Sequence, residues 1–273
     1  MPFDIGEGRL QRADGAARVT FARRGAATVL AELAQRVPCR VLFPVVDEGD
    51  PVQAVLLTTS GGLTGGDHVA VAAAVGAEAC ATVTTLAAEK LYRSTGADCR
   101  IHVDLSVAEG GWLEWLPQET IMFDGARLRR RVEARVAASG RLLAAEIMMF
   151  GRAASGETLN RGLLQDGWAV RRDDRLLWLD AIRLDGDLAA ARRRPFGFGN
   201  AAGYGTVIYV GPDAEAAADR VRPHDVSVIN GVMVVRVLDE DGARLRGAVG
   251  DVITRLRSGM RGLPARLPRV WAL

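Results

Sequence analysis

The sequence has few of the residues that build common metal and redox sites. It contains three cysteines, Cys39, Cys80 and Cys99, which are too widely spaced for the CxxC pairs of a zinc ribbon or a thioredoxin-like site. An odd number of scattered cysteines fits a reducing compartment. The three histidines form neither HxxxH nor HExxH. A local metal motif is therefore absent, although distant residues could still converge in the fold.

Long apolar runs and blocks of like charge are also missing. No run approaches the roughly 20 apolar residues of a membrane helix, and the N-terminal MPFDIGEGRL lacks the pattern of a secretory signal. The formal net charge of +2 comes from arginines interspersed with acids, so nucleic-acid binding has no footprint. We expect the arginine clusters 129–131 and 192–194 to be solvated or to face a partner. These features predict a cytoplasmic protein that binds neither nucleic acid nor membrane.

The motifs of several enzyme classes are absent as well. The glycine-rich segment 57–67 contains neither the GxSxG of a nucleophile elbow nor a Walker GxxxxGK[ST]. The glycines of 197–203 lack the preceding strand that a dinucleotide-binding motif requires. Lysine is nearly missing, because Lys90 is the only one and the other 34 basic residues are arginine. Either codon bias has left one lysine, or a compact ammonium is needed at this position.

What the sequence does contain is a succession of short strand-like segments. Runs of β-branched and small apolar residues at 52–59, 69–75 and 79–85 are separated by glycine-containing turns. In Cys99–Val107, apolar and polar residues alternate as in a half-buried strand. Turn signals recur at intervals of roughly 8–15 residues, which favours a mainly β architecture over βαβ units. No linker interrupts the pattern, so we expect residues 1–273 to form a single domain.

Two segments near the C-terminus have helical patterns. Pro212–Arg222 begins with proline and acids, as helix N-termini often do. Ala243–Ser258 carries apolar residues at helical spacing and arginines on its remaining surface. This helix either packs on the β body or docks a partner together with the tail LPARLPRVWAL. The segment 185–200, with three consecutive arginines and the loop PFGFG, is expected to be a flexible excursion.

Several acids stand within or beside apolar strand-like segments, where a carboxylate is costly unless it is paired, hydrogen-bonded or hydrated. They are Glu114, Glu119, Asp124, Glu146, Glu157 and Asp180. Each alone could be a satisfied structural acid. Together they would suit an internal polar path.

Several motifs, in this order and spacing, resemble the urease accessory protein family UreD, called UreH in some species. They are GGLTGGD at 61–67, TTLAAEKLYRS at 84–94, Gly111–Ala126 and Gly151–Glu157, with the ending Leu267–Trp271 also similar. The resemblance runs from about Arg40 to Asp180. Leu86 departs from it, since relatives commonly have Gln or Pro there. The segments before Arg40 and from 185 to 225 are less characteristic.

The resemblance implies a non-enzymatic role in delivering nickel to apo-urease. The family fold is a β-helix-like stack of many short strands with two helices. UreD-like proteins bind UreF, and through it the GTPase UreG, in a dimeric assembly that contacts the urease subunits. No cofactor would be bound permanently, and Ni²⁺ would be in transit through an internal tunnel. Spaced carboxylates suit such a tunnel because they attract a cation and then release it.

The positions of individual residues in this sequence suggest which of them would carry out the role that the resemblance implies. Asp67, Glu146 and Asp180 are expected to contact nickel in passage, although Asp67 could instead bind only turn amides. The wall of the passage is expected to comprise Gly61, Gly62, Gly65, Gly66, Glu89, Lys90, Tyr92, Arg93, Glu119 and Asp124. Partner contacts are expected at Arg255, Arg257 and Trp271. Two other hypotheses stay open: a pure adaptor that holds urease open, and an enzyme with Lys90 and Arg93 as anion contacts.

Overall fold

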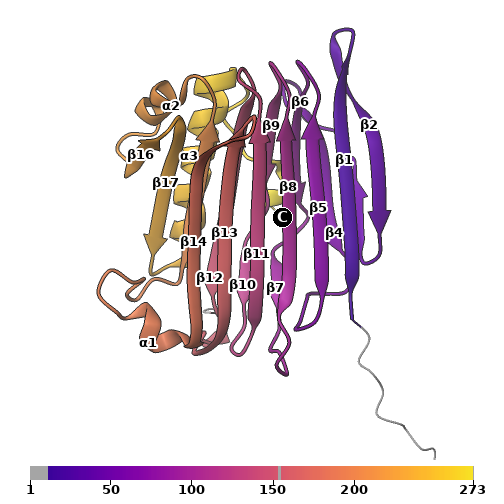
Figure 1. Cartoon of the computed structure of the whole chain (residues 1–273). Helices are drawn as coiled ribbons and strands as arrows, with labels where there is room; N and C mark the ends of the chain where they lie inside the picture. Colours follow the sequence, from indigo (N-terminus) through magenta and orange to yellow (C-terminus); the bar gives the residue numbers. More distant parts are fainter. Residues whose placement is uncertain (1–11, 153–154, 273) are drawn as a thin grey trace, which may run out of the picture.

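Two β-sheets lie face to face and form the body of the protein, with helices behind one of them (Figure 1). The computed structural model describes residues 12–152 and 155–272; the predictions for the N-terminal ten residues, and for Ala153 and Ala154 of the Gly151–Glu157 motif, lie outside these ranges. The strands of the seven-stranded sheet are, in spatial order, β14 (Arg175–Asp187), β13 (Arg161–Arg172), β11 (Arg127–Val136), β8 (Cys99–Val107), β5 (His68–Val75), β1 (Asp14–Arg24) and β2 (Ala27–Arg36).

The second sheet has ten strands. Its main path is β16 (Val226–Ile229), β17 (Val232–Asp239), β15 (Gly203–Val210), β12 (Arg141–Phe150), β9 (Trp112–Leu116), β6 (Cys80–Thr85), β4 (Val52–Thr58) and β3 (Cys39–Leu42). The short strands β7 (Glu89–Leu91) and β10 (Thr120–Met122) extend it beside β12.

The chain passes back and forth between the two sheets. β4, β6, β9 and β12 are parallel neighbours in one sheet, and β5, β8, β11 and β13 are parallel neighbours in the other. The result is a β-solenoid-like stack of about four turns. The prediction of a mainly β, β-helix-like stack is therefore confirmed.

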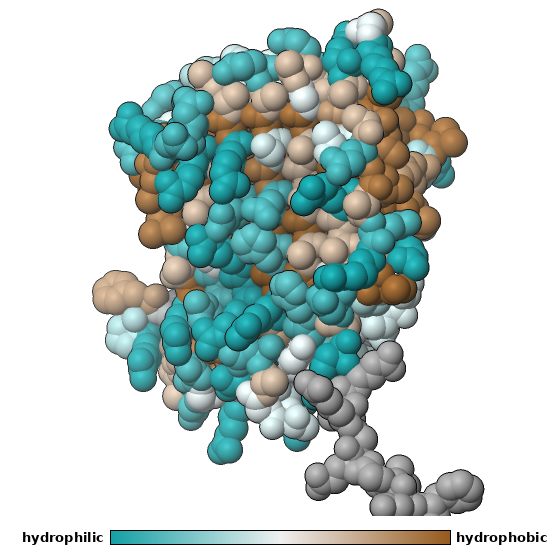
Figure 2. All heavy atoms as spheres, turned by 45° about the vertical axis from the view of Figure 1, so that its right-hand side comes forward, coloured by the Kyte–Doolittle hydropathy of each residue, from teal (hydrophilic) through white to brown (hydrophobic). Residues whose placement is uncertain are grey.

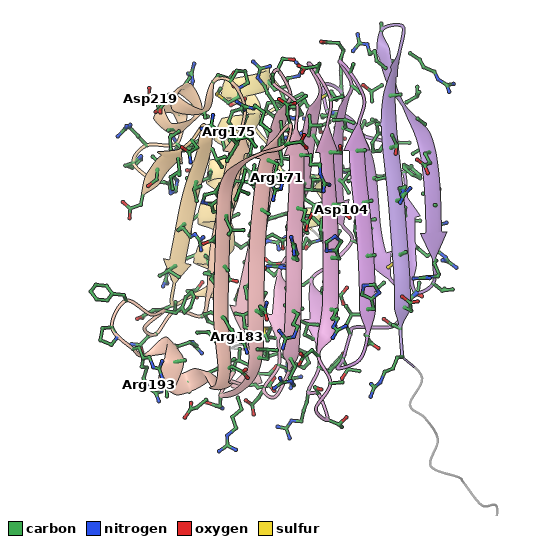
Figure 3. All side chains as sticks on the ribbon, viewed as in Figure 1. Asp104, Arg171, Arg175, Arg183, Arg193 and Asp219 are labelled. Atoms are coloured by element: carbon green, nitrogen blue, oxygen red, sulfur yellow. The ribbon has the colours of Figure 1, made fainter. Side chains whose placement is uncertain are left out.

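Alternation along the strands builds the core between the sheets. In β8, Cys99, Val103, Leu105 and Val107 are buried, whereas Arg100 and Ser106 are exposed on the opposite face, as the sequence predicts. Successive side chains of a strand point to opposite faces, so the same pattern in neighbouring strands creates one apolar layer. The outer face of the seven-stranded sheet carries polar side chains such as Asp104, Arg171 and Arg183 (Figure 3).

The two predicted helices cover the outer face of the ten-stranded sheet. They are α2 (Ala214–Arg220) and α3 (Gly242–Arg261). The side chain of Asp241 accepts a hydrogen bond from the Arg244 amide at 2.9 Å and caps α3, which ends at Gly262 with φ 67°. The apolar face of α3 packs on β15, β17 and β12, forming a second core. None of the helices in the described residues is long and apolar enough to cross a membrane.

Residues 185–200 comprise a strand end, a helix and a turn, elements that the sequence did not indicate. β14 continues to Asp187, whose side chain accepts from the Ala190 amide at 2.8 Å and caps α1 (Leu188–Arg192). Arg192 is buried, stacks over the Phe150 ring at 4.5 Å and donates to the Ala201 carbonyl at 2.6 Å. The segment is thus folded onto the body of the protein, and the expectation of a solvated cluster is wrong for Arg192.

Candidate functional site

A cavity of about 280 Å³ lies between the two sheets. Its wall includes Gly61 and Lys90, which are exposed, and Trp115, Arg130 and Glu146, which are buried. The cavity therefore extends from the surface of the protein to the centre of the space between the sheets.

The outer end of this cavity is built by the glycine-rich loop and by β7. The Leu63 amide donates to the Lys90 carbonyl, and the Tyr92 amide donates to the Leu63 carbonyl, each at 2.8 Å. On β7, Glu89 accepts a hydrogen bond from the Thr58 hydroxyl at 3.0 Å. Burial raises the pKa of Glu89 above its usual value, although the Thr58 hydrogen bond opposes this effect. The mouth of the cavity thus holds one acid and the single lysine of the chain.

The inner end of the cavity is a buried cluster of charges around Arg130 of β11. The Nε and Nη2 groups of Arg130 donate to Asp166 of β13, at 2.9 and 2.7 Å, and Nη1 donates to Glu146 of β12. Trp115 Nε1 donates to Glu146 at 3.0 Å, and the Tyr204 hydroxyl donates to Asp166 at 2.7 Å. All three charged side chains are at most 4% exposed. Each carboxylate is therefore held by one charged and one neutral donor.

The two acids of this cluster differ in electrostatic environment. Burial, together with the charge of Asp166, raises the pKa of Glu146, although Arg130 opposes the shift. For Asp166, burial is outweighed by Arg130, Tyr204 and the charge of Arg236, so its pKa lies below the usual value. Glu146 is consequently the carboxyl that accepts a proton more readily.

The row of charges continues from Asp166 to the far side of the sheets. Arg236 of β17 acts on Asp166 electrostatically and forms an ion pair with Asp180 of β14. Arg236 and Asp180 line a second depression together with Asp225 and Ser227. Acids and arginines thus alternate from Glu146 to Asp180. This row of charges connects two of the three acids that were predicted to contact nickel.

Asp67 has a different environment. It is 6% exposed and accepts hydrogen bonds from the Ala13 amide at 2.8 Å and the Thr64 amide at 2.7 Å. It is not on the wall of the cavity. Asp67 therefore binds backbone amides of the turn, which is the alternative role considered for this residue in the sequence analysis.

The residues predicted to form the passage wall fall into two groups. Gly61, Gly62, Glu89 and Lys90 line the cavity. The others support the surrounding loops and do not line it: Gly65, Gly66, Tyr92, Arg93, Glu119 and Asp124. Asp124, for example, accepts from the Asn160 and Arg161 amides at 2.8 and 3.0 Å. The second group shapes the region without facing the cavity.

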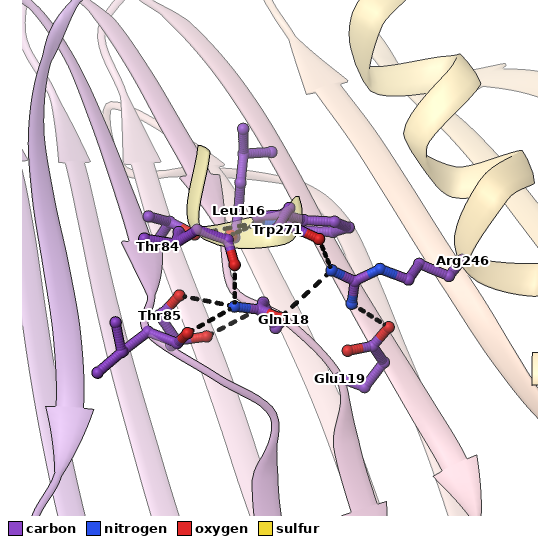
Figure 4. A network of polar contacts seen from close by, with 9 residues as sticks. Thr84, Thr85, Leu116, Gln118, Glu119, Arg246 and Trp271 are labelled. Carbon is purple, nitrogen blue, oxygen red and sulfur yellow. Dashed lines mark hydrogen bonds and ion pairs between the residues drawn. The ribbon is translucent and has the colours of Figure 1, made fainter. Parts of the chain in front are cut away.

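The C-terminal tail is fastened beside the cavity by a network of polar contacts (Figure 4). Gln118, a wall residue, donates to the Val270 carbonyl at 3.0 Å, and Trp271 Nε1 donates to the Thr84 hydroxyl at 3.2 Å. Arg246 of α3 stacks over the Trp271 ring at 4.6 Å and pairs with Glu119. The tail is therefore part of the protein's own fold, and Glu119 acts in holding it.

Two of the three residues predicted to contact a partner are buried within the chain. Trp271 is 6% exposed and lies in the network just described. Arg257 is 2% exposed and donates to Glu114 and Asp50, at 2.9 Å each. The prediction of direct partner contact is thus corrected for Arg257 and Trp271, because their polar groups are used internally. Arg255 is on the exposed face of α3 and stays a predicted contact.

Three residues of the charge row, Arg130, Asp166 and Arg236, were not predicted from the sequence, and neither was Tyr204, which donates a hydrogen bond to Asp166. The cluster Arg129–Arg131 suggested a solvated segment, yet Arg130 shares the inward phase of Leu128 and Val132 in β11. Asp166 likewise shares the phase of Leu164 and Trp168 in β13. A charged residue at an apolar position of an alternating strand is the signal that could have found both.

The cysteines give a testable consequence of burial. Burial, reinforced by the Glu89 charge, raises the pKa of Cys39 to about 11, and burial also raises the pKa of Cys80 to about 11 and of Cys99 to about 12. Because the thiolate is the nucleophile, alkylation by iodoacetamide at pH 8 should be about 100-fold slower in the native chain than in guanidinium chloride. Mass spectrometry of quenched samples measures this; rapid labelling of all three native thiols would contradict the assigned environments.

Comparisons with known proteins identify the family. The model of the family described as UreD urease accessory protein matches residues 13–272. The chain is 39% identical to urease accessory protein UreD of Magnetococcus marinus, over 96% of this chain and 94% of that protein. It is 41% identical to the UreD of Methylobacterium sp. strain 4-46, over 96% of both chains, and 40% identical to that of Xanthobacter autotrophicus, over 96% and 91%. The chain therefore belongs to the UreD family of urease accessory proteins.

Proposed function

We propose that this urease accessory protein is a non-catalytic scaffold that links UreF and UreG to apo-urease and conducts nickel ions between its two sheets. The observation that carries the proposal is the cavity that reaches from Lys90 at the surface to the buried Glu146. Its two carboxylates, Glu89 and Glu146, can attract a divalent cation and exchange it readily, and Lys90 and Arg130 are the cations on the same wall. The row continuing to Asp180 offers the same chemistry on the far side.

Apolar surface on the edge strands supports the scaffold part of the proposal. Leu30 and Leu33 of β2, Leu42 of β3, and the following Phe43 and Val45 are exposed. Figure 2, which brings the β1–β2 side forward, shows apolar atoms among the polar ones on this part of the surface. Exposed apolar groups of this kind favour association with other proteins, here UreF or the urease subunits.

Substitution of the passage acids tests the conduit. Glu146→Gln and Asp180→Asn keep the side-chain shape and remove the charge. In cells that express the urease genes, we expect each to lower the nickel content of purified urease about tenfold, the scale of losing a residue that acts on a metal. Glu215→Gln, at an exposed acid of α2, is the matched control and should have no effect.

Complex integrity decides between the conduit and the adaptor. The amount of UreF, UreG and urease that co-purifies with each variant should equal that of the unaltered chain. Normal nickel content with an intact complex in both variants would reject the conduit and favour the pure adaptor.

A further inference from the structure

The guanidinium of Arg130 is a fixed cation inside the proposed passage. It is held on one side by two hydrogen bonds to Asp166 and on the other by one contact with Glu146. Its Nη1 group also lies 3.3 Å from the Thr120 hydroxyl. A guanidinium is charged at every physiological pH and presents its donors in a rigid fork. The positive charge at this point is therefore permanent, and its position is set by the fold.

The two carboxylates do not hold Arg130 equally. Asp166 takes a bidentate pair, which is the stronger geometry, whereas Glu146 receives Nη1 alone. Glu146 also lines the cavity, and Asp166 does not. A cation that moves inward through the cavity therefore meets Glu146 before Asp166. To bind there it has to compete with the single Nη1 contact and with the hydrogen bond from Trp115 Nε1, while the pair of Arg130 with Asp166 stays in place.

We propose that Arg130 is an internal counter-cation that keeps Glu146 from retaining the transported nickel ion. When nickel leaves Glu146, the Nη1 group returns, so the carboxylate is never left buried and unpaired. Without Arg130, the buried Glu146 would lose its permanent counter-charge, and a divalent cation would be the best available replacement. Arg130 thus sets how long the ion stays at the centre of the passage. This inference rests on the proposed function, because it assumes that nickel reaches Glu146.

Nickel binding by the purified full-length chain tests the inference. Arg130→Met removes the charge and keeps an unbranched side chain. We expect isothermal titration calorimetry to show that this variant binds one Ni²⁺ with a Kd about tenfold lower than that of the unaltered chain. Added Ni²⁺ should also raise the melting temperature of this variant more than that of the unaltered chain. Arg130→Met/Glu146→Gln should lose the gain.

A charge-balanced variant covers the case in which Arg130→Met does not fold. Arg130→Met/Asp166→Asn removes one cation and one acid together, so the net charge of the buried cluster is unchanged. It leaves Glu146 without its counter-cation, and it should therefore also bind Ni²⁺ at least about tenfold more tightly than the unaltered chain. Unchanged nickel affinity in this folded variant would overturn the role of Arg130.

The two proposals can fail separately. Loss of nickel from urease in the Glu146→Gln cells, combined with no tighter binding in the Arg130 variants, would reject the counter-cation and leave the conduit standing. Normal urease nickel in both the Glu146→Gln and the Asp180→Asn cells, with the complex intact, would reject the conduit itself.

Discussion

Replacing Arg257 by alanine is expected to lower the free energy of unfolding by about 3–5 kcal/mol. The side chain is 2% exposed, and it lies between α3 and the ten-stranded sheet, where it pairs with Glu114 and Asp50. Glu114 is fully buried. Removal of the guanidinium would leave that carboxylate without its charged partner in a low-dielectric environment. Urea denaturation followed by tryptophan fluorescence measures the loss, because Trp112 donates to the same carboxylate.

Arg255 provides the matched control on the same helix. It is exposed and pairs with Asp251 one turn earlier, at 2.7 Å. Exposed pairs of this kind contribute about 0.3–0.5 kcal/mol, so Arg255→Ala should change the midpoint of unfolding very little. Equal losses for the two variants would show that the Arg257 cluster does not stabilise the fold. A specific loss of partner binding in Arg255→Ala would support the contact predicted there.

The elements of the fold that the sequence predicts well are those with a strong local period. Two examples are the alternation in Cys99–Val107 and the apolar stripe of Ala243–Ser258. In each, the repeating pattern within a single strand or helix shows which of its faces is buried. α1 is short, and it depends on the capping by Asp187 and on the packing of Arg192 against Phe150, 42 positions away in the chain. Such contacts leave no local period, so the segment reads as a loop.

The same limit applies to the candidate site. Glu146 and Asp180 stand out as acids in apolar strands, because their own neighbours identify them. The residues that complete the charge row do not stand out in this way. Arg130, for example, is brought beside Asp166 only by the pairing of β11 with β13. Arg257 shows the converse: an arginine on an amphipathic helix looks solvent-exposed until Glu114 is placed beneath it. Charge pairing across sheets is set by the topology, and no local pattern records it.

Substitution of Gly65 by alanine is expected to destabilise the protein by about 3 kcal/mol, at the upper end of the range for inserting a methyl group into a packed site. A Cβ at this position would lie 2.3 Å from the Ala97 carbonyl oxygen and 2.0 Å from the Ser94 hydroxyl. The hydroxyl can rotate away, but the carbonyl belongs to the backbone and cannot. The loop would have to separate from the segment around Ala97, and thermal unfolding measures the cost.

A substitution at Gly61, in the same loop, is the control that distinguishes this steric clash from the loss of glycine's backbone freedom. Its φ is 73°, yet a Cβ there would meet nothing within 4 Å. Gly61→Ala should therefore cost only the strain of a left-handed conformation, about 1 kcal/mol. If Gly65→Ala were no more destabilising than Gly61→Ala, the close approach to Ala97 would not be a constraint on the loop. The larger expected loss at Gly65 follows because the glycine-rich loop is packed against the next turn of the chain, which holds the outer end of the cavity in place.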